Sequence, residues 1–290
     1  MAPFFQSPSP FREKSLLIAG LARNCAKSLH AEIKNLREAF SEAAHIGWII
    51  VESDSDDQTP AVLAQLTLEI PHFTLLSLGK VADKIPLRAP RIAYCRNQYL
   101  HYLDQNRDRY DFLVVADLDG INDGLSARAV NSCGTRNDWD VCTANQNGPY
   151  YDIWALRHED WSPNDCWRQF NFYRAHGYAH ERALQSAVYS RMVRIDSNEA
   201  WIPVESAFGG LGIYNVDILK DARYAGLSAD GQEICEHVAL HEYLRAKGAR
   251  IFINPNLTNG GFNEHTEALK LWPTLKRRTK HRINRWLGKI

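Results

Sequence analysis

The segment from Phe112 to Ala116 is an apolar run that is followed at once by two carboxylates, Asp117 and Asp119. An apolar run of this length is typical of a strand that is buried on both faces of a sheet. In open α/β folds, ligands bind beyond the carboxyl ends of such strands. We therefore expect an α/β protein in which Asp117 and Asp119 lie at the binding edge of a central sheet.

Strand and helix patterns alternate along the first half of the chain. Residues 15 to 22 are apolar and of strand length, residues 23 to 44 carry apolar side chains three and four positions apart, and residues 48 to 51 are apolar again. This order predicts a strand, a helix and a second strand. A short helix from Thr59, a strand over 73 to 78 and a helix over 91 to 103 extend the alternation, which favours a mostly parallel sheet.

The second half of the chain is less regular. Apolar segments at 141 to 145 and 150 to 156 precede a loop rich in Trp, Asn and Pro at 161 to 167. Residues 200 to 215 indicate strands interrupted by glycines, among them Gly209 and Gly210, which would let the backbone approach a ligand closely. We expect a helix over 233 to 247 and a last strand over 250 to 254 that Pro255 ends.

Several protein classes are excluded by what the sequence lacks. It has no apolar run of 18 residues that could span a membrane, and its first ten residues lack the apolar core of a signal peptide, which favours a cytoplasmic location. The six cysteines include no Cys-x-x-Cys pair, so we expect reduced packing residues. A P-loop, a nucleophile elbow and a dinucleotide-binding glycine motif are also missing.

Charge is concentrated at the C-terminus. Residues 270 to 290 hold eight of the 34 Lys and Arg residues and none of the 34 acids, which leaves a net charge of −8 on residues 1 to 269. Trp272 and Trp286 alternate with these charges, a pattern that suits a helix lying on the anionic inner face of a membrane. Nucleic-acid binding competes with this hypothesis, although we expect no nucleic-acid partner, and a solvated helix packed on the domain is the structural alternative.

The chemistry of the Asp-x-Asp pattern points to a metal. Two carboxylates beyond a buried strand can give Mn²⁺ or Mg²⁺ one or two oxygen ligands and leave the remaining positions to water and a substrate phosphate. A turn or a helix N-cap is the alternative explanation for Asp117 and Asp119. The position of the pair, midway along the chain and directly after a strand, makes the metal hypothesis the more specific of the two.

Four local strings carry a family resemblance: Arg-Ile-Ala-Tyr-Cys-Arg-Asn at 91 to 97, Tyr-Asp-Ile-Trp-Ala-Leu-Arg at 151 to 157, Phe-Gly-Gly-Leu-Gly at 208 to 212 and Cys-Glu-His at 235 to 237. With the order of elements, they resemble the GT-A fold glycosyltransferases and, within them, the fungal capsule-associated α-1,3-mannosyltransferase family and its bacterial relatives. This resemblance implies one Rossmann-like domain over residues 15 to 265. An N-terminal extension (1 to 14) and a basic amphipathic tail (266 to 290) would flank it.

The resemblance also implies roles on the donor side of a site. Asp119, and less directly Asp117, would hold the metal on a diphosphate. Glu52 would contact the nucleoside, although acids after a strand also suit a solvated loop. Arg91 and Arg96 would pair with phosphate, with surface salt bridges as the alternative. His265, after the last strand, would complete the metal shell.

Further residues are implied on the acceptor side. Glu236 would act as general base in an inverting enzyme or position the acceptor in a retaining one, and a helix N-terminal acid is its structural alternative. Asp152, Trp154 and Arg157 would line the sugar or acceptor pocket together with Gly209 and Gly210, although Trp154 also suits the core.

The implied activity is transfer of a hexose from a nucleotide-diphosphate sugar to a glycan hydroxyl in surface-polysaccharide or lipid-linked glycan synthesis. GDP-mannose is the favoured donor and a UDP-hexose the next. Two hypotheses from other classes remain open. His237 and His241, four residues apart on a predicted helix, could bind zinc in a hydrolase, although Val238 stands where the protease pattern has Glu. A non-catalytic module that binds a membrane or partner through its tail is the other.

Overall fold

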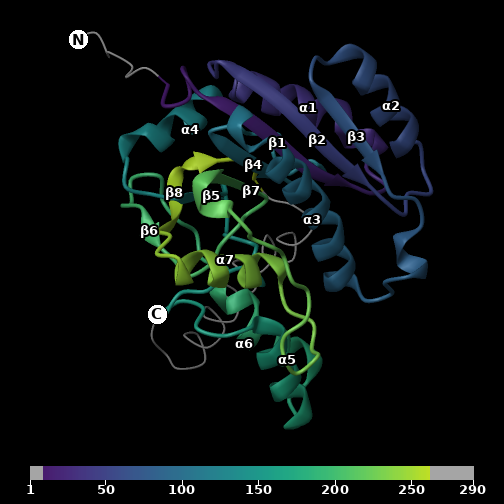
Figure 1. Cartoon of the computed structure of the whole chain (residues 1–290). Helices are drawn as coiled ribbons and strands as arrows, with labels where there is room; N and C mark the ends of the chain where they lie inside the picture. Colours follow the sequence, from purple (N-terminus) through teal and green to yellow (C-terminus); the bar gives the residue numbers. More distant parts are fainter. Residues whose placement is uncertain (1–8, 262–290) are drawn as a thin grey trace, which may run out of the picture.

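The computed structural model describes residues 9 to 261, so His265, the basic tail and most of the N-terminal extension lie outside the described residues (Figure 1). Within this part, the strands form one eight-stranded sheet in the order β3-β2-β1-β4-β7-β5-β8-β6. The strands are β1 (Ser15–Ala22), β2 (His45–Glu52), β3 (Phe73–Ser77), β4 (Phe112–Ala116), β5 (Val141–Asn145), β6 (Ile202–Pro203), β7 (Leu211–Asn215) and β8 (Ile251–Thr258).

Seven α-helices connect these strands within residues 9 to 261. They are α1 (Ala26–Ala39), α2 (Thr59–Glu69), α3 (Arg88–Gln105), α4 (Ala127–Asn131), α5 (Cys166–Ala175), α6 (His180–Ala187) and α7 (Glu236–Ala246). Short 3₁₀ turns occur at Val81–Asp83, Arg107–Arg109, Ser132–Thr135, Tyr189–Arg191 and Asp217–Leu219. None of the helices in the described part is both long and apolar enough to cross a bilayer.

The sheet is mixed and mostly parallel, as the sequence predicts. β1 pairs in parallel with β2 and β4, β2 with β3, and β5 with β8. β7 lies antiparallel between β4 and β5, and β6 is antiparallel to β8. Because β1, β2 and β4 run in one direction, the residues that follow each of them meet at the same edge of the sheet.

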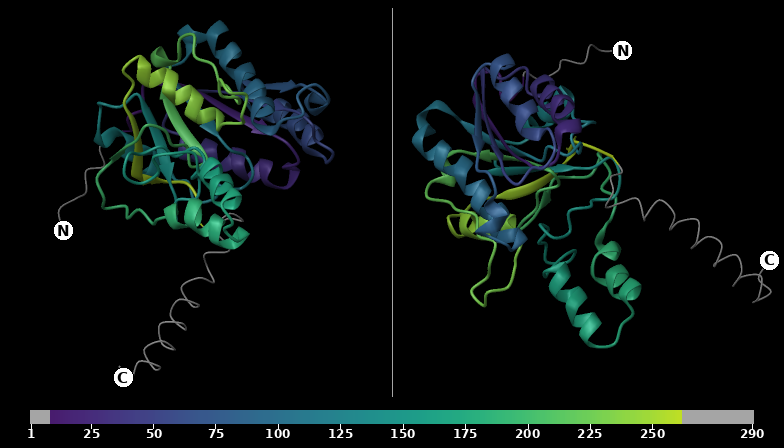
Figure 2. Two further views of the ribbon diagram at one scale, coloured as in Figure 1. Left: turned by 90° about the horizontal axis from the view of Figure 1, so that it is seen from below. Right: turned by 90° about the vertical axis from the view of Figure 1, so that its right-hand side faces the viewer.

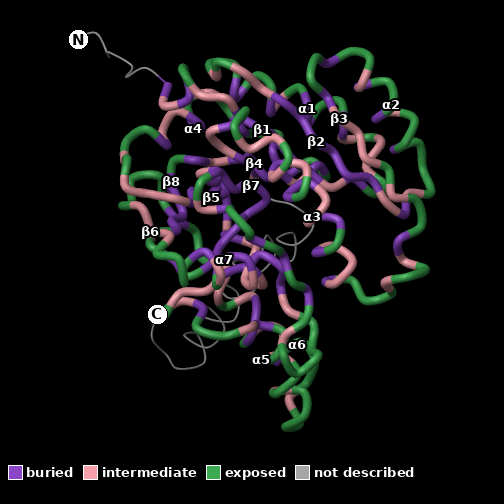
Figure 3. The backbone as a smooth tube through the Cα atoms, in the orientation of Figure 1, coloured by how far each residue is buried: buried purple, intermediate pink, exposed green. Residues whose placement is uncertain are grey.

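Helices cover both faces of the sheet, which explains why the central strands are apolar throughout. Leu16 and Ile18 of β1 pack into a core with α1, α2 and α4, whereas Leu17 and Ala19 pack into a second core with α3 and α7. Figure 3 shows the buried backbone following these strands. The alternation of side chains along a strand therefore supplies two cores, and β4 is buried as predicted from Leu113 to Ala116, with Phe112 partly buried.

The last strand and one loop differ from the sequence-based expectation. β8 continues through Pro255 to Thr258, so the prediction that Pro255 ends it is wrong. The ladder between β5 and β8 is irregular at this point, pairing Thr143 with Ile253 and then Asn145 with Thr258. A proline is tolerated where the ladder is interrupted, because its missing N–H is not required there.

The segment after Leu156 also contains helices that the sequence pattern did not predict. The predicted loop at 161 to 167 runs into α5, which begins at Cys166, where Asp165 Oδ1 accepts hydrogen bonds from the N–H groups of Trp167 and Arg168. α5 and α6 form a hairpin that projects from the sheet, as the two further views show (Figure 2). The apolar segment at 150 to 156 is irregular, with one turn at 153 to 155.

Candidate active site

The loop after β4 begins the candidate site. The Asp117 N–H donates to the Gly210 carbonyl at 2.9 Å, which continues the pairing of β4 with β7 for one residue beyond the strand. The Asp117 side chain is 34% exposed and Asp119 is exposed. Both carboxylates therefore lie at the carboxyl end of β4, at the edge of the sheet where the sequence predicts them.

Arg96 of α3 is the buried centre of this site. Its Nε donates to Glu236 Oε1 at 3.0 Å, and its Nη2 lies 3.6 Å from Asp117 Oδ1. The guanidinium also lies near the rings of Phe208 and Tyr224, with its carbon 5.3 and 5.7 Å from their centroids. Arg96 thus joins the first turn of α7 to the loop after β4. Glu236 follows Arg96 by 140 residues in the sequence and Asp117 follows it by 21.

Negative charge exceeds positive charge around Arg96. Burial, together with repulsion from Asp119, Asp152 and Glu236, raises the pKa of Asp117 to about 7 in spite of the nearby Arg96 guanidinium. Burial likewise raises the pKa of Asp152. Several carboxylates near one arginine favour an additional cation, because a positive charge offsets the repulsion that adds to the effect of burial on these pKa values.

The donor set at this cluster suits a metal that is shared with a substrate. The described residues contain no group of three or more His, Cys, Asp or Glu side chains arranged to hold a metal by themselves. Asp117 and Asp119 would therefore supply only part of a coordination shell. Mg²⁺ and Mn²⁺ bind in this way in phosphate-transfer sites, through one or two carboxylates, with water and phosphate oxygens as the other ligands.

Gly209 and Gly210 hold the neighbouring loop, and both have positive φ angles, of +66° and +81°. A Cβ on Gly209 would lie 2.8 Å from the Ala144 carbonyl oxygen, and one on Gly210 would lie 2.9 Å from Ile121 Cγ2. The Gly209 N–H donates to Asp152 Oδ2 at 3.1 Å. A side chain at either position would clash with neighbouring protein atoms, so the fold itself requires both glycines. The hydrogen bonds of Gly209 to Asp152 and of Gly210 to Asp117 place Asp152 beside the loop after β4.

A buried acid on α1 that sequence analysis missed supports the same loop. Glu32 accepts a hydrogen bond from the Asn122 N–H at 3.1 Å and another from the Asn122 side-chain amide at 3.0 Å. The same amide donates to the Asp117 carbonyl at 2.8 Å, and the Asn122 oxygen accepts from Asn259 at 3.2 Å. An available signal was that Glu32 interrupts the apolar face of its helix, where a charged residue needs a buried partner.

Replacement of Glu32 by alanine is expected to destabilise the fold by about 1–3 kcal/mol, because two buried donors of Asn122 lose their acceptor. Glu32→Gln keeps one acceptor oxygen and should lose less. Glu42→Ala is the matched control, since Glu42 accepts an equivalent amide hydrogen bond from Asn131 in an exposed position. Urea unfolding measures the three variants; equal losses for Glu32→Ala and Glu42→Ala would contradict this prediction.

The ends of β2 and β3 form the other part of the edge. Glu52 is buried at the end of β2, and its two oxygens accept from the Ser55 N–H at 3.2 Å and from Ser77 Oγ at 2.6 Å. Arg91 donates to the Ile85 and Pro86 carbonyls and lies 3.8 Å from Asp54. Glu52 and Arg91 therefore fix the loops around this edge of the sheet. Arg91 and Arg96 contact different residues, so the structure does not bring the two arginines to the same partner.

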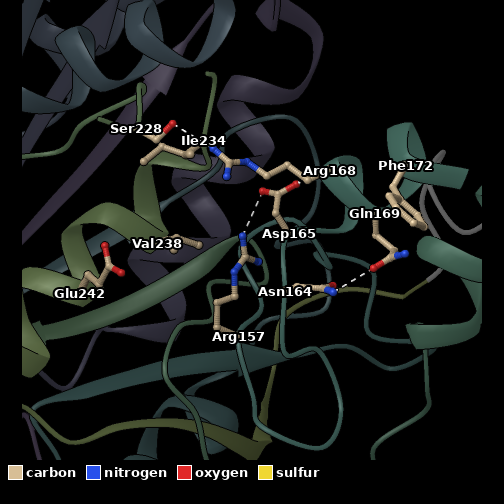
Figure 4. A pocket seen from close by; sticks show the side chains of 10 residues that line it. All are labelled: Arg157, Asn164, Asp165, Arg168, Gln169, Phe172, Ser228, Ile234, Val238 and Glu242. Atoms are coloured by element: carbon tan, nitrogen blue, oxygen red, sulfur yellow. Dashed lines mark hydrogen bonds and ion pairs between the residues drawn. The ribbon is translucent and has the colours of Figure 1, made fainter. Parts of the chain in front are cut away.

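Trp154 and Arg157 follow Asp152 in the sequence and lie next to Asp165, the residue before α5. Both donate to Asp165 Oδ2, the Trp154 indole and the Arg157 guanidinium each at 3.0 Å. Arg157 and Asp165 line a cavity of about 460 Å³ between α5, α7 and the loop before α7 (Figure 4). Asp152, Trp154 and Arg157 are thus part of one continuous segment, with Asp152 beside Gly209 and Arg157 at the cavity.

The paired histidines of α7 are packed in the core and do not form a zinc site in the described part of the chain. His241 shares hydrogen bonds with Ser206 Oγ at 2.9 Å and with the Tyr214 hydroxyl at 3.0 Å, which engages both of its ring nitrogens. The His237 ring stacks on Phe208 with centroids 3.9 Å apart. Coordination of a metal by both residues would require breaking this packing.

These histidines predict a loss of stability in acid. Burial lowers the pKa of His241 from 6.5 to about 3, so the folded state keeps the ring neutral while the unfolded chain takes up a proton below pH 6.5. The contribution of His241 to the free energy of unfolding is therefore fully present above pH 6.5. It is lost as the pH falls from 6.5 toward 3, by up to about 1.4 kcal/mol per pH unit. Urea unfolding at several pH values should show a shallower decline in His241→Gln, and an unchanged decline would contradict the assignment.

Comparison with known proteins supports the fold. The sequence matches no known protein-family model and no curated protein. The structure is similar to a mannosyltransferase from Pyrobaculum calidifontis in complex with GDP-Man and Mn²⁺, with 14% identity and a TM-score of 0.51 over 89% of this chain. It is also similar to S. aureus TarS in complex with UDP-GlcNAc, with 12% identity and a TM-score of 0.50 over 86% of this chain.

The chain spans 59% of the length of each of these two solved structures. Similarity at such low identity is similarity of fold, and it establishes an α/β fold of the GT-A type for this chain.

Proposed function

We propose that the protein is a metal-dependent glycosyltransferase that moves a hexose from a nucleotide-diphosphate sugar to a hydroxyl group of a glycan. The observation that carries this proposal is that Arg96 lies against Asp117 and Glu236 at the edge where β1, β2 and β4 end, with Asp119 and Asp152 adding negative charge near Asp117. A site of this kind combines excess negative charge with an incomplete set of metal ligands. It suits a cation that arrives with a diphosphate.

The donor side would be built from the loops after β2 and β4. Asp119 and Asp117 would hold Mn²⁺ or Mg²⁺, which when bound neutralises the charge that develops on the departing nucleoside diphosphate. His265 would complete this metal shell. Glu52 and Arg91 would shape the nucleoside pocket, since their hydrogen bonds fix the loops at 53 to 55 and 85 to 86.

The acceptor side would be built around the first turn of α7. In an inverting reaction, Glu236 would take the proton of the attacking acceptor hydroxyl. In a retaining reaction, Glu236 would orient the acceptor instead. Arg96 would hold the carboxylate in place in either case, through the 3.0 Å hydrogen bond to Oε1. Asp152, Gly209 and Gly210 would form the adjoining part of the sugar pocket.

Mannose from GDP-mannose is the donor we favour, with a UDP-hexose second. Two observations support it: the fold similarity to the Pyrobaculum calidifontis mannosyltransferase, which was solved with GDP-Man, and the resemblance of four sequence strings to the capsule-associated mannosyltransferases. The acceptor would be a surface polysaccharide or a lipid-linked glycan. In this proposal residues 15 to 265 form the catalytic domain, and the basic tail (266 to 290) attaches the otherwise cytoplasmic protein to the inner face of a membrane.

Thermal unfolding in the presence of nucleotides tests the proposal. GDP, UDP, CMP and their sugar conjugates would each be added with and without Mn²⁺. One nucleoside diphosphate is expected to raise the Tm only when Mn²⁺ is present, since a ligand at a hundred times its Kd stabilises the folded state by about 2.7 kcal/mol. Stabilisation by Zn²⁺ alone, with no effect of any nucleotide, would instead favour a hydrolase.

A further inference from the structure

Helices α5 and α6 form a hairpin that projects beyond the rest of the protein. The two helices pack chiefly on each other, and the right-hand view of Figure 2 shows them extending away from the sheet. The backbone at their outer end is mostly exposed (Figure 3). Residues 166 to 194, which comprise both helices and the turn after α6, are called the hairpin segment, and residues 172 to 182 are its tip. A partner would meet the tip first.

The hairpin segment is strongly basic within an acidic protein. It holds one acid, Glu181, whereas residues 1 to 269 as a whole carry a net charge of −8. Its five arginines are Arg168, Arg174, Arg182, Arg191 and Arg194. Arg174, Arg182 and Arg194 are exposed and form no ion pair within residues 9 to 261. Unpaired guanidinium groups gathered in one projecting segment favour an anionic partner.

The tip carries aromatic rings among these charges. Phe172 packs on His176, with ring centroids 4.1 Å apart, and is still 54% exposed. The Tyr178 ring stacks on Tyr173 with centroids 4.9 Å apart, and the guanidinium carbon of Arg182 lies 5.0 Å from the Tyr178 centroid. Aromatic rings next to arginines are typical of segments at the boundary of water and lipid, where the rings sit among the headgroups and the cations attract anionic lipids.

Hydrogen bonds within the turn between the two helices keep the tip in shape without a partner. Arg174 Nη1 donates to the Tyr178 carbonyl at 2.7 Å, and the Tyr178 N–H donates to the Tyr173 carbonyl at 3.0 Å. Gly177, with a φ of +85°, allows the chain to reverse at this point. A tip that is already ordered loses little conformational entropy when it binds.

The apolar surface of the hairpin segment favours a lipid bilayer over a nucleic acid, which arginines would also attract. Trp167, Phe172 and Val193 are 41%, 54% and 43% exposed, and they are three of the seven large apolar side chains exposed in the part of the chain that the structure describes. Val193 has no ring to stack on a base, but an aliphatic side chain suits the acyl boundary of a bilayer. A projecting tip also keeps the acidic remainder of the protein away from an anionic surface.

We propose that the hairpin segment binds the surface of a bilayer that contains anionic lipids, with Phe172 among the headgroups and Arg174 and Arg182 on their phosphates. This contact is separate from the basic tail, and it does not depend on the glycosyltransferase function. Asp165, which precedes α5, accepts a hydrogen bond from Trp154 at 3.0 Å. The contact would therefore fix the position of the candidate site relative to the membrane.

Co-sedimentation of the full chain with vesicles tests the proposal. The vesicles consist of phosphatidylcholine alone or of an equal mixture with phosphatidylglycerol, and the wild type is expected to bind the mixture more tightly. Arg174→Gln/Arg182→Gln should lower the partition coefficient on the mixture by about tenfold or more, since each arginine near an anionic surface contributes about fivefold. Phe172→Ser should lower it by about threefold or more, because an apolar side chain is no longer buried in the headgroup region. These side chains are exposed, so the fold is retained.

Matched variants at other places on the surface are the controls. Arg37→Gln/Arg128→Gln also removes two exposed arginines, but from α1 and α4, which lie at the opposite end of the molecule from α5 and α6 in Figure 1. Leu68→Ser changes an apolar side chain of α2 that is 88% exposed. Both control variants should bind the mixed vesicles as the wild type does, because their changes lie far from the tip.

Hydrogen–deuterium exchange separates the tip from the basic tail. Mixed vesicles should slow amide exchange in peptides from residues 172 to 182. Unchanged exchange there, or wild-type partition in both hairpin variants, would overturn the proposal. Binding of a DNA duplex that the double variant loses, without any effect of vesicles on the tip, would replace the lipid by a nucleic acid. Both hairpin variants should keep the Mn²⁺-dependent increase in Tm with the donor, so a donor panel without effect overturns the glycosyltransferase proposal alone.

Discussion

Replacement of Asp119 by alanine is expected to reduce sugar transfer by about 10²–10³-fold or more, because one removed group that stabilises developing charge already costs this much in other enzymes. The Mn²⁺-dependent increase in Tm with the nucleotide donor should disappear in the same variant. Asp119 is exposed, so the protein should unfold at the wild-type temperature when no ligand is present. Transfer of a radiolabelled hexose and thermal unfolding measure the two effects.

Asp123→Ala is the matched control for this prediction. Asp123 is an exposed carboxylate in the same loop, four residues farther along, so its removal changes the net charge of the loop by the same amount. If the two variants lose activity equally, general electrostatic attraction of a cation explains the effect and Asp119 is not a ligand. Full transfer activity in Asp119→Ala would exclude the metal-dependent mechanism.

The central part of the fold follows from local sequence patterns. β1 and β4 are apolar on both faces because helices cover both sides of the sheet. In the sequence, such strands are uninterrupted apolar runs, which can be recognised without the structure. The position of Asp117 and Asp119 was predictable for the same reason, since residues that follow a buried parallel strand lie at the carboxyl edge of the sheet. These predictions need only the neighbouring residues.

The contacts that arrange the candidate site are long-range and left no local signal. Arg96 and Glu236 are 140 residues apart, and the antiparallel β7 enters the sheet between β4 and β5. Arg96 looked equally suited to phosphate or to a surface salt bridge, because its hydrogen-bond geometry serves any carboxylate or phosphate. Only the tertiary structure shows that it is buried among acids. α5 was missed although Cys166, Phe170 and Tyr173 recur at helical spacing, because the Trp, Asn and Pro residues at 161 to 167 indicate a loop.

Removal of the Arg96 guanidinium is expected to have the largest effect on stability. Arg96→Met keeps much of the side-chain volume but leaves the buried Glu236 carboxylate without its partner and Asp117 without the nearest positive charge. Breaking a buried ion pair from one side costs about 3–5 kcal/mol, because an uncompensated charge stays in a medium of low polarity. Urea unfolding of the two proteins at one pH measures this difference directly.

A double variant distinguishes the lost ion pair from lost packing against Phe208 and Tyr224. Arg96→Met/Glu236→Gln removes the stranded charge, so it should be more stable than the sum of the two single changes predicts, by about 0.5–3 kcal/mol. Arg245→Met is the control for an exposed ion pair. Its partner Glu205 is half exposed, and such pairs contribute about 0–1 kcal/mol to the free energy of unfolding. Additive losses in the double variant would mean that Arg96 acts through its contacts with the aromatic rings, and the acidic cluster would then depend on a bound cation rather than on Arg96 for its balance of charge.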